Sequence, residues 1–338
     1  MTMSRLVPLA LSLLTACAVA QAPTRAAAAD GYDPLAVTQD QKVESVLLAA
    51  HDAKRERDIP LRVYLPAAKA PAAVVLFSHG LGGSRDTSPY LGEHWAKRGY
   101  VAVFLQHPGS DESVWRGAPA RERMDRLREA ANGRELLARA EDVHAVLDQL
   151  EAWNGDEEHA LRGRLDLAHV GMSGHSFGAY TTQVVAGGSF RVIGQAQLDP
   201  RIDAALPMSP SWPKGGDGTS AFAKVALPWL CMTGTEDVSP IGDQDAASRR
   251  KVFAALPAGI DHYELVLDGA QHSAFVGSEG RARFGAKNPN HHRAVLALST
   301  AFWDTYLRGD EAARAWLQGD AARGVLEPKD VWQSAPKR

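Results

Sequence analysis

The chain has 338 residues, of which 45% are hydrophobic and 23% are charged, and its formal net charge is -3. These proportions are typical of a globular protein with enough apolar residues for one sizeable core. The near-neutral charge argues against nucleic acid as a partner, because nucleic-acid-binding proteins present a strongly basic face. Length alone allows about two domains, but α/β enzymes often use this much chain in one.

Arginines are dense between residues 116 and 139, but acidic residues are interleaved with them. The pairs Glu122 with Arg126 and Glu135 with Arg139 have the i,i+4 spacing of ion pairs on a helix. We therefore predict a solvated helix face over this stretch and no binding site for a polyanion.

The N-terminus has the layout of an export signal. Arg5 precedes an apolar run over residues 6–20 that is too short to span a bilayer permanently, and small residues follow it. Cleavage after Ala20 or Ala22 agrees with this layout. Alternatively, the letters LTAC ending at Cys17 resemble a bacterial lipobox, in which the cysteine becomes the lipidated first residue of the mature protein. In both cases we predict export to the periplasm or beyond, and membrane contact only through an anchor at Cys17.

The chain shows no internal repeat and divides into four predicted segments. These are a signal peptide at 1–22, a tether at 23–38, a single α/β domain at 39–325 and a C-terminal tail at 326–338. The only cysteine besides Cys17 is Cys231. A chain cleaved after Cys17 therefore has no intramolecular disulfide and depends on its core for stability.

The first predicted elements are two apolar-rich segments, 43–48 and 61–65, on either side of the charged stretch 54–58. They predict an antiparallel hairpin at a sheet edge. Further on, continuous apolar runs predict strands that are covered on both faces. In chain order these runs are 72–77, 101–105, 169–172, 204–208, 227–232 and 263–267.

Helices are predicted between these strands. The segment 89–98 has the pattern of a helix ended by Gly99. Between residues 136 and 150, apolar residues recur at three- and four-residue spacing. Another helix starts at about residue 177, and the last long helix includes 295–306. This alternation predicts an α/β fold with a mostly parallel sheet and helices on both faces.

The strongest local signal is the sequence GHSFG at 174–178, which follows an apolar strand and opens a helix. That context is typical of a nucleophile elbow, where a serine sits at a sharp turn and its hydroxyl projects above the sheet. Gly174 and Gly178 leave room for the strand and the helix to approach each other. We predict Ser176 as the nucleophile.

A serine nucleophile needs a base, and the base needs a carboxylate that orients it. The strand at 227–232 leads into Asp237, and the strand at 263–267 leads into His272. Both residues are thus expected at carboxyl ends of strands, and we predict His272 as the base and Asp237 as the acid. The other carboxylates that compete for the acid role are Glu236, Asp203 and Asp243. The histidines expected at the surface are His51, His144 and His159.

Two backbone amides are predicted to hold the oxyanion of a tetrahedral intermediate. One is the amide of Phe177, and the other is that of Leu81 in the glycine-rich stretch HGLGG at 79–83. Trp115 and Trp212 lie in predicted loops, where they either line a substrate pocket or pack locally. The sequence contains no motif for a metal site or a phosphate loop, so we predict neither a metal nor a cofactor.

From about residue 74 to residue 275 the chain resembles the platelet-activating-factor acetylhydrolase-like branch of the α/β hydrolases, which is often grouped with predicted dienelactone hydrolases. The matching stretches are FSHGLG at 77–82, residues 98–107, VGMSGHSFG at 170–178 and the helix at 139–150. The resemblance implies that Ser176 and His272 are nucleophile and base, and that Leu81 and Phe177 provide the oxyanion amides.

The chain departs from that branch in two places. The acetylhydrolases carry the triad acid after the strand that matches 204–208, where this chain reads LPMSP without a carboxylate. The acid role therefore falls to Asp237. Dienelactone hydrolases use a cysteine at the position of Ser176.

The resemblance thus implies ester hydrolysis but neither of the substrates that name those families. We predict a carboxylic ester hydrolase that forms an acyl-enzyme on Ser176, with a small-molecule or lipid-like ester as its substrate. The alternatives are an amide or peptide hydrolase or an acyltransferase with the same triad, or a non-catalytic binding protein.

Overall fold

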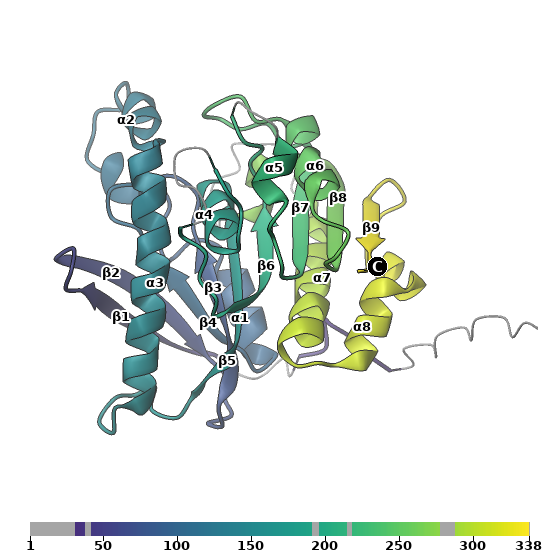
Figure 1. Ribbon diagram of the computed structural model, residues 1–338, viewed down its shortest axis with the longest axis horizontal. Coiled ribbons are helices and arrows are strands. Elements are labelled where there is room, and N and C mark those ends of the chain that lie inside the picture. Colours follow the sequence, from purple (N-terminus) through teal and green to yellow (C-terminus); the bar gives the residue numbers. More distant parts are fainter. Residues whose placement is uncertain (1–30, 38–41, 191–195, 215–217, 278–287, 338) are drawn as a thin grey trace, which may run out of the picture.

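The computed structural model describes residues 31–37, 42–190, 196–214, 218–277 and 288–337. Within these residues a nine-stranded sheet has the order β1-β2-β4-β3-β5-β6-β7-β8-β9 (Figure 1). In this order, neighbouring strands from β4 through β3 to β8 are parallel. The pairs β1–β2, β2–β4 and β8–β9 are antiparallel. The strands are β1 (Glu44–Asp52), β2 (Arg57–Leu65), β3 (Ala72–Ser78), β4 (Val101–Leu105), β5 (Leu165–His175), β6 (Ile202–Met208), β7 (Trp229–Glu236), β8 (His262–Gln271) and β9 (Val331–Ala335).

The central strands are apolar on both faces because each face is covered. In β3, Val74 and Leu76 point into one buried cluster, and Val75 and Phe77 point into the other. Successive side chains of a strand point to opposite faces, so a strand between two helix layers is a continuous apolar run. The predicted edge hairpin is present as β1 and β2.

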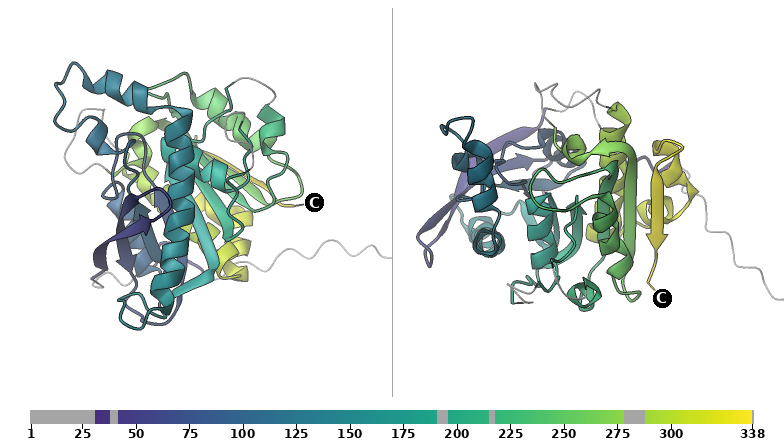
Figure 2. Two further views of the ribbon diagram at one scale, coloured as in Figure 1. Left: turned by 60° about the vertical axis from the view of Figure 1, so that its left-hand side comes forward. Right: turned by 90° about the horizontal axis from the view of Figure 1, so that it is seen from above.

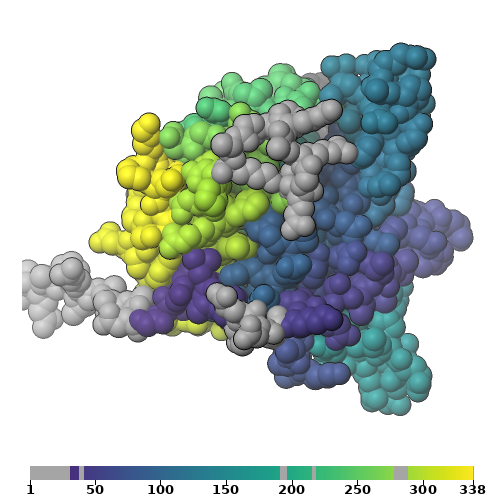
Figure 3. All heavy atoms as spheres, turned by 180° about the vertical axis from the view of Figure 1, so that it is seen from behind, coloured from purple at the N-terminus to yellow at the C-terminus, as the bar shows by residue number. Residues whose placement is uncertain are grey.

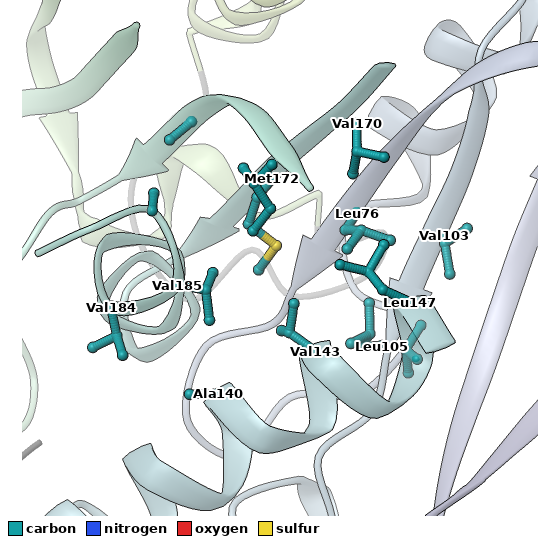
Figure 4. Packing of buried hydrophobic residues seen from close by; sticks show 14 of the residues in the cluster. Leu76, Val103, Leu105, Ala140, Val143, Leu147, Val170, Met172, Val184 and Val185 are labelled. Carbon is teal, nitrogen blue, oxygen red and sulfur yellow. The ribbon is translucent and has the colours of Figure 1, made fainter. Parts of the chain in front are cut away.

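Helices α3 (Gly133–Gly155), α4 (Phe177–Val185) and α6 (Ala246–Ala255) cover the face of the sheet that is in front in Figure 1. Short helix α5 (Gly218–Phe222) contacts α6 on this side. The predicted apolar stripe of α3 lies against strand residues, as the close view in Figure 4 shows. The residues labelled there are Leu76, Val103, Leu105, Ala140, Val143, Leu147, Val170, Met172, Val184 and Val185.

The opposite face is covered by α1 (Pro89–Lys97), α7 (Pro289–Leu307) and α8 (Glu311–Gln318). Figure 3 shows the molecule from this side, with the yellow-green surface of the C-terminal segments close to the blue surface of earlier ones. Trp95 of α1 and Trp303 of α7 pack edge to face, with their ring centroids 6.0 Å apart. The sheet therefore lies between two layers of helices, as predicted.

The arginine-rich stretch forms two helices, and the first of them is mostly exposed, as predicted. Helix α2 (Arg123–Ala130) ends before Asn132, whose side chain caps α3, and α2 lies beyond the end of α3 in Figures 1 and 2. The predicted pair Glu122–Arg126 forms at 3.1 Å. The prediction is wrong for Arg139, which is fully buried on the inner side of α3.

The two ends of the described chain are attached to the domain. Tyr32, in the predicted tether, donates a hydrogen bond of 2.7 Å to Asp304 of α7. The predicted tail at 326–338 contains β9, which pairs with β8, and Trp332 stacks on Tyr263 with centroids 5.6 Å apart. The sheet thus extends past residue 325, because this aromatic residue is buried against β8. The predicted signal peptide and Cys17 lie outside the described residues.

Candidate active site

The elbow between β5 and α4 holds Ser176 in a strained backbone conformation, with φ 57° and ψ −115°. Such an angle is costly for a residue with a side chain and persists only where the surrounding structure enforces it. At Gly178, a Cβ atom would lie 1.9 Å from the carbonyl oxygen of Ser78, and at Gly174 one would lie 2.4 Å from the oxygen of Gly178. Both flanking positions therefore require glycine.

The structure brings Ser176, His272 and Asp237 together at the carboxyl ends of β5, β8 and β7. The Oγ atom of Ser176 lies 2.9 Å from Nε2 of His272. On the other side of the ring, Nδ1 lies 2.7 Å from Oδ1 of Asp237. With Nδ1–H donating to the carboxylate, Nε2 is free to accept the serine proton, which is the arrangement that a general base requires.

Asp237 is fully buried and remains ionised. Burial alone would raise its pKa, but the hydrogen bond with His272 and the charge of Arg249 lower this pKa to about 2. Its Oδ2 atom accepts hydrogen bonds from Ser209 at 2.7 Å and from Thr233 at 2.8 Å. Three hydrogen bonds and the ion pair with Arg249 thus fix the carboxylate in position.

The competing carboxylates have other partners and do not contact His272 within the described residues. Glu236 accepts a hydrogen bond of 3.3 Å from Gln271. Exposed Asp243 pairs with Lys214 at 2.7 Å. Asp203 accepts from the backbone amide of Val170 at 2.8 Å. His51, His144 and His159 are exposed or partly exposed, as expected.

The glycine-rich loop after β3 lies directly beside the nucleophile. A Cβ atom on Gly80 would be 3.4 Å from Cβ of Ser176. The amide of Gly82 donates to the carbonyl of Ser110 at 2.9 Å, which fixes the loop. Among the residues that the structure describes, the backbone amides of Leu81 and Phe177 donate to no other protein group. Both amides are thus available to a substrate oxygen.

Arg139, which the sequence patterns did not indicate as part of the site, holds this loop by hydrogen bonds. Its Nη1 donates to the carbonyl of His79 at 2.7 Å and its Nε donates to Ser110 Oγ at 2.8 Å. The guanidinium also lies over the ring of Phe177, 4.6 Å from the centroid. The signal was its position in the apolar stripe, because Leu136 precedes it by three residues and Val143 follows it by four.

His175, the second residue of the elbow motif, supports the base. Its Nε2–H donates to the carbonyl of His272 at 2.9 Å, and the two rings lie 4.7 Å apart. Burial lowers the pKa of His175 to about 3, so its ring is neutral at ordinary pH. The contact holds the turn that carries the base.

A cavity of about 1540 Å³ opens above Ser176 and His272. Trp212 lines it, whereas Trp115 does not: its indole N–H donates to the carbonyl of Gly82 at 2.7 Å. Trp115 therefore packs locally behind the glycine-rich loop, and the expectation that it lines the pocket is corrected. The apolar side chains of the lining include Leu127, Leu136, Tyr180, Phe190, Pro213 and Ile241.

The described part of the chain contains no group of three or more His, Cys, Asp or Glu side chains placed to hold a metal ion. In the same residues no helix has the length and hydropathy needed to cross a membrane.

No family model matches the chain. Cutinase 2 from Thermobifida cellulosilytica is 26% identical over 213 residues, which cover 63% of this chain and 64% of that protein. Cutinase cut1 from Thermobifida fusca is also 26% identical over 213 residues, 63% of this chain and 53% of the relative. A bis(hydroxyethyl) terephthalate hydrolase from Streptomyces coelicolor is 24% identical over 218 residues, 62% of this chain and 54% of the relative.

These similarities support the α/β-hydrolase superfamily. Together with the sheet order and the helices on both faces, they confirm the predicted α/β-hydrolase fold class. They do not support the acetylhydrolase-like branch that the sequence motifs suggested. The chain matches less than two thirds of the length of the first relatives.

Proposed function

We propose that this protein is a serine hydrolase that cleaves carboxylic esters through an acyl-enzyme on Ser176. The observation that carries the proposal is the continuous contact from Ser176 through His272 to buried Asp237, at the floor of a large cavity. The relatives named cutinase and bis(hydroxyethyl) terephthalate hydrolase support an ester as the bond that is cleaved.

In the acylation step, His272 Nε2 takes the proton of Ser176 as its Oγ atom attacks the ester carbonyl carbon. The carbonyl oxygen becomes an oxyanion, which the amides of Leu81 and Phe177 stabilise by hydrogen bonds. Asp237 stabilises the imidazolium that forms. When the bond to the leaving alkoxide breaks, His272 donates its proton to that oxygen, and the alcohol departs.

Deacylation repeats the same proton movements with water. His272 removes a proton from a water molecule, the hydroxide attacks the acyl carbon, and the same two amides hold the second oxyanion. The bond to Ser176 then breaks, and His272 returns a proton to its Oγ atom. The products are a carboxylic acid and the free enzyme.

The cavity favours an extended, largely apolar ester over a short one. Its volume of about 1540 Å³ exceeds the range of about 300–1,000 Å³ that is typical of small-ligand sites. Apolar parts of its lining come from Phe177 and Tyr180, which follow the nucleophile in the chain, and from Trp212. A lipid-like ester or a polyester fragment is therefore the substrate class that we propose.

The export prediction is also part of this proposal. It rests on the apolar run at 6–20 and the small residues after it, with Cys17 as the alternative lipid anchor. Mass spectrometry of the mature protein from a bacterial host distinguishes the two. Signal cleavage predicts a start just after Ala20 or Ala22, and lipidation predicts a diacylglycerol on an N-terminal Cys17.

The proposed function is tested by comparing p-nitrophenyl esters of increasing acyl length with the matching p-nitroanilides. We expect hydrolysis of the esters, with higher kcat/KM for medium or long chains than for acetate. Faster cleavage of the anilides would favour an amide hydrolase. Transfer of the acyl group to an added alcohol in preference to water would favour an acyltransferase, and no turnover with either series would favour a binding protein.

A further inference from the structure

Arg249 is a buried cation beside the proposed triad. It belongs to α6, and its side chain is 2% exposed. Its Nε atom lies 3.0 Å from Oδ1 of Asp237, the same oxygen that accepts from His272. A cation in this position is not needed to orient the imidazole, because Asp237 already does so.

The same guanidinium connects the loops that follow two neighbouring strands. Its Nη1 donates to the carbonyls of Ser209 at 2.7 Å and Pro210 at 3.0 Å, after β6. Its Nε donates to the carbonyl of Asp237 at 3.2 Å, after β7. Since arginine offers five donors in a rigid fork, these contacts hold the guanidinium in one place.

The third nitrogen of the fork faces the base directly. Nη2 of Arg249 lies 3.2 Å from Nδ1 of His272. If Nδ1 accepted from the guanidinium, the ring proton would sit on Nε2, and the base could not accept the serine proton. Because Asp237 is ionised and 2.7 Å away, Nδ1–H points to the carboxylate, and the contact with Arg249 is one between two donors.

A positive charge at this distance opposes a second one. Protonation of His272 creates an imidazolium beside a guanidinium that burial prevents water from screening. Arg249 also pairs with Asp237, so the carboxylate attracts the imidazolium less strongly. Both effects favour the neutral ring.

We propose that Arg249 is a positioning residue whose charge keeps His272 neutral, and so able to act as a base, at lower pH than in the same enzyme without this charge. Arg249 thereby sets the lowest pH at which the enzyme is active. This inference rests on the proposed function.

Other titratable groups surround the same ring, and none of them is a fixed cation beside Nδ1 in the described residues. The ring of His175 is neutral and lies 4.7 Å from that of His272, tilted by 44°. Glu236 at the end of β7 pairs with Gln271. The groups that line the same cavity from α1 and α7 are Tyr90, Glu93, His291 and His292.

The test is the pH dependence of Ser176 labelling by a fluorophosphonate probe, measured from about pH 4 to pH 9 in four forms of the full chain. These are the wild type, Arg249→Gln, Arg249→Lys and Arg250→Gln. The last is the matched control: it removes one charge from the same helix, but Arg250 is half-exposed and pairs with Glu264. The probe needs only an activated serine, so it works without a known substrate.

We expect the pH of half-maximal labelling to rise by about one unit or more in Arg249→Gln. It should stay close to the wild-type value in Arg249→Lys, which keeps the charge, and in Arg250→Gln. If both Arg249 variants slow labelling but leave this pH unchanged, the residue is only structural and the proposal is wrong. A downward shift in Arg249→Gln also contradicts it.

Two controls keep the result interpretable. Circular dichroism shows whether Arg249→Gln is folded, and Arg249→Met, which retains most of the packed length, replaces it if it is not. Absence of labelling in the wild type contradicts the proposed function, and this inference with it. Labelling of the wild type with an unshifted pH profile in the uncharged variants contradicts only the role of Arg249.

Discussion

Replacing Asp237 by asparagine tests the acid assignment with the smallest change of shape. The structure predicts which way the amide will turn. Oδ2 faces the hydroxyls of Ser209 and Thr233, which can rotate to accept from an amide, whereas Oδ1 faces two donors, His272 and Arg249. The asparagine NH₂ group should therefore face the hydroxyls, and its oxygen should still accept from Nδ1–H. The variant loses the charge but keeps the productive tautomer.

The expected loss can be estimated from the charge alone. Two unit charges about 4 Å apart at an effective dielectric constant of about 20 attract by about 4 kcal/mol. That is the order of the stabilisation that Asp237 gives to the imidazolium in the transition state. At about 1.4 kcal/mol for each factor of ten, the rate should fall by about a thousandfold. In this variant Asp237 no longer balances the charge of Arg249, which also disfavours the imidazolium and lowers the rate further.

The assay is kcat/KM for a p-nitrophenyl ester near pH 8, with thermal unfolding to verify the fold. Glu236→Gln and Asp243→Asn are the controls, because each neutralises a carboxylate that does not contact the imidazole. Both should remain within about a few-fold of the wild type, since exposed charges interact weakly. If Asp237→Asn stays within about tenfold of the wild type, the acid assignment is wrong.

Three further outcomes follow from the geometry. Gly178→Ala should lower the melting temperature and abolish ester hydrolysis, because its Cβ would lie 1.9 Å from a backbone oxygen of Ser78; a folded, active variant would contradict this account of the elbow. Trp212→Ala should change the preference among p-nitrophenyl esters of different acyl length, whereas Trp115→Phe should leave that preference unchanged and slow all esters alike. The pKa of Asp237 is lowered from 3.8 to about 2, so its contribution to stability is present above about pH 4 and is lost as the pH falls toward 2; thermal unfolding should show a smaller loss over this window in Asp237→Asn than in the wild type.

The sequence predicted the layered fold because its signals are local. Strands such as Ala72–Ser78 are continuous apolar runs, and α3 carries an apolar stripe at helical spacing, so each element shows its own environment. The position of Ser176 was equally local, since strand, glycines and helix are adjacent in the chain. β9 was missed because only one of its five side chains, that of Trp332, is buried, so the strand is not a continuous apolar run like β4.

The supporting charges could not be predicted in this way. Arg139 lies in the apolar stripe of α3, which indicates burial but not its partners, and Arg249 looks like a solvated residue in an alternating sequence. The carbonyl groups that both residues bind come from distant segments. The contact between Ser209 and Asp237 likewise joins the ends of two different strands. For Trp115 and Trp212 the sequence gives the same loop context, and only the direction of each side chain separates cavity lining from local packing.

The central claim is that a covalent acyl-enzyme forms on Ser176. The most direct measurement is mass spectrometry of peptides after the enzyme has been quenched during turnover of a slowly deacylating p-nitrophenyl ester, in parallel with Ser176→Ala. We predict an acyl mass on the peptide that contains Ser176, its absence in Ser176→Ala, and a loss of kcat/KM of about a thousandfold or more in that variant. An acyl group on another residue, or a Ser176→Ala variant that retains activity within about tenfold of the wild type, would contradict the account.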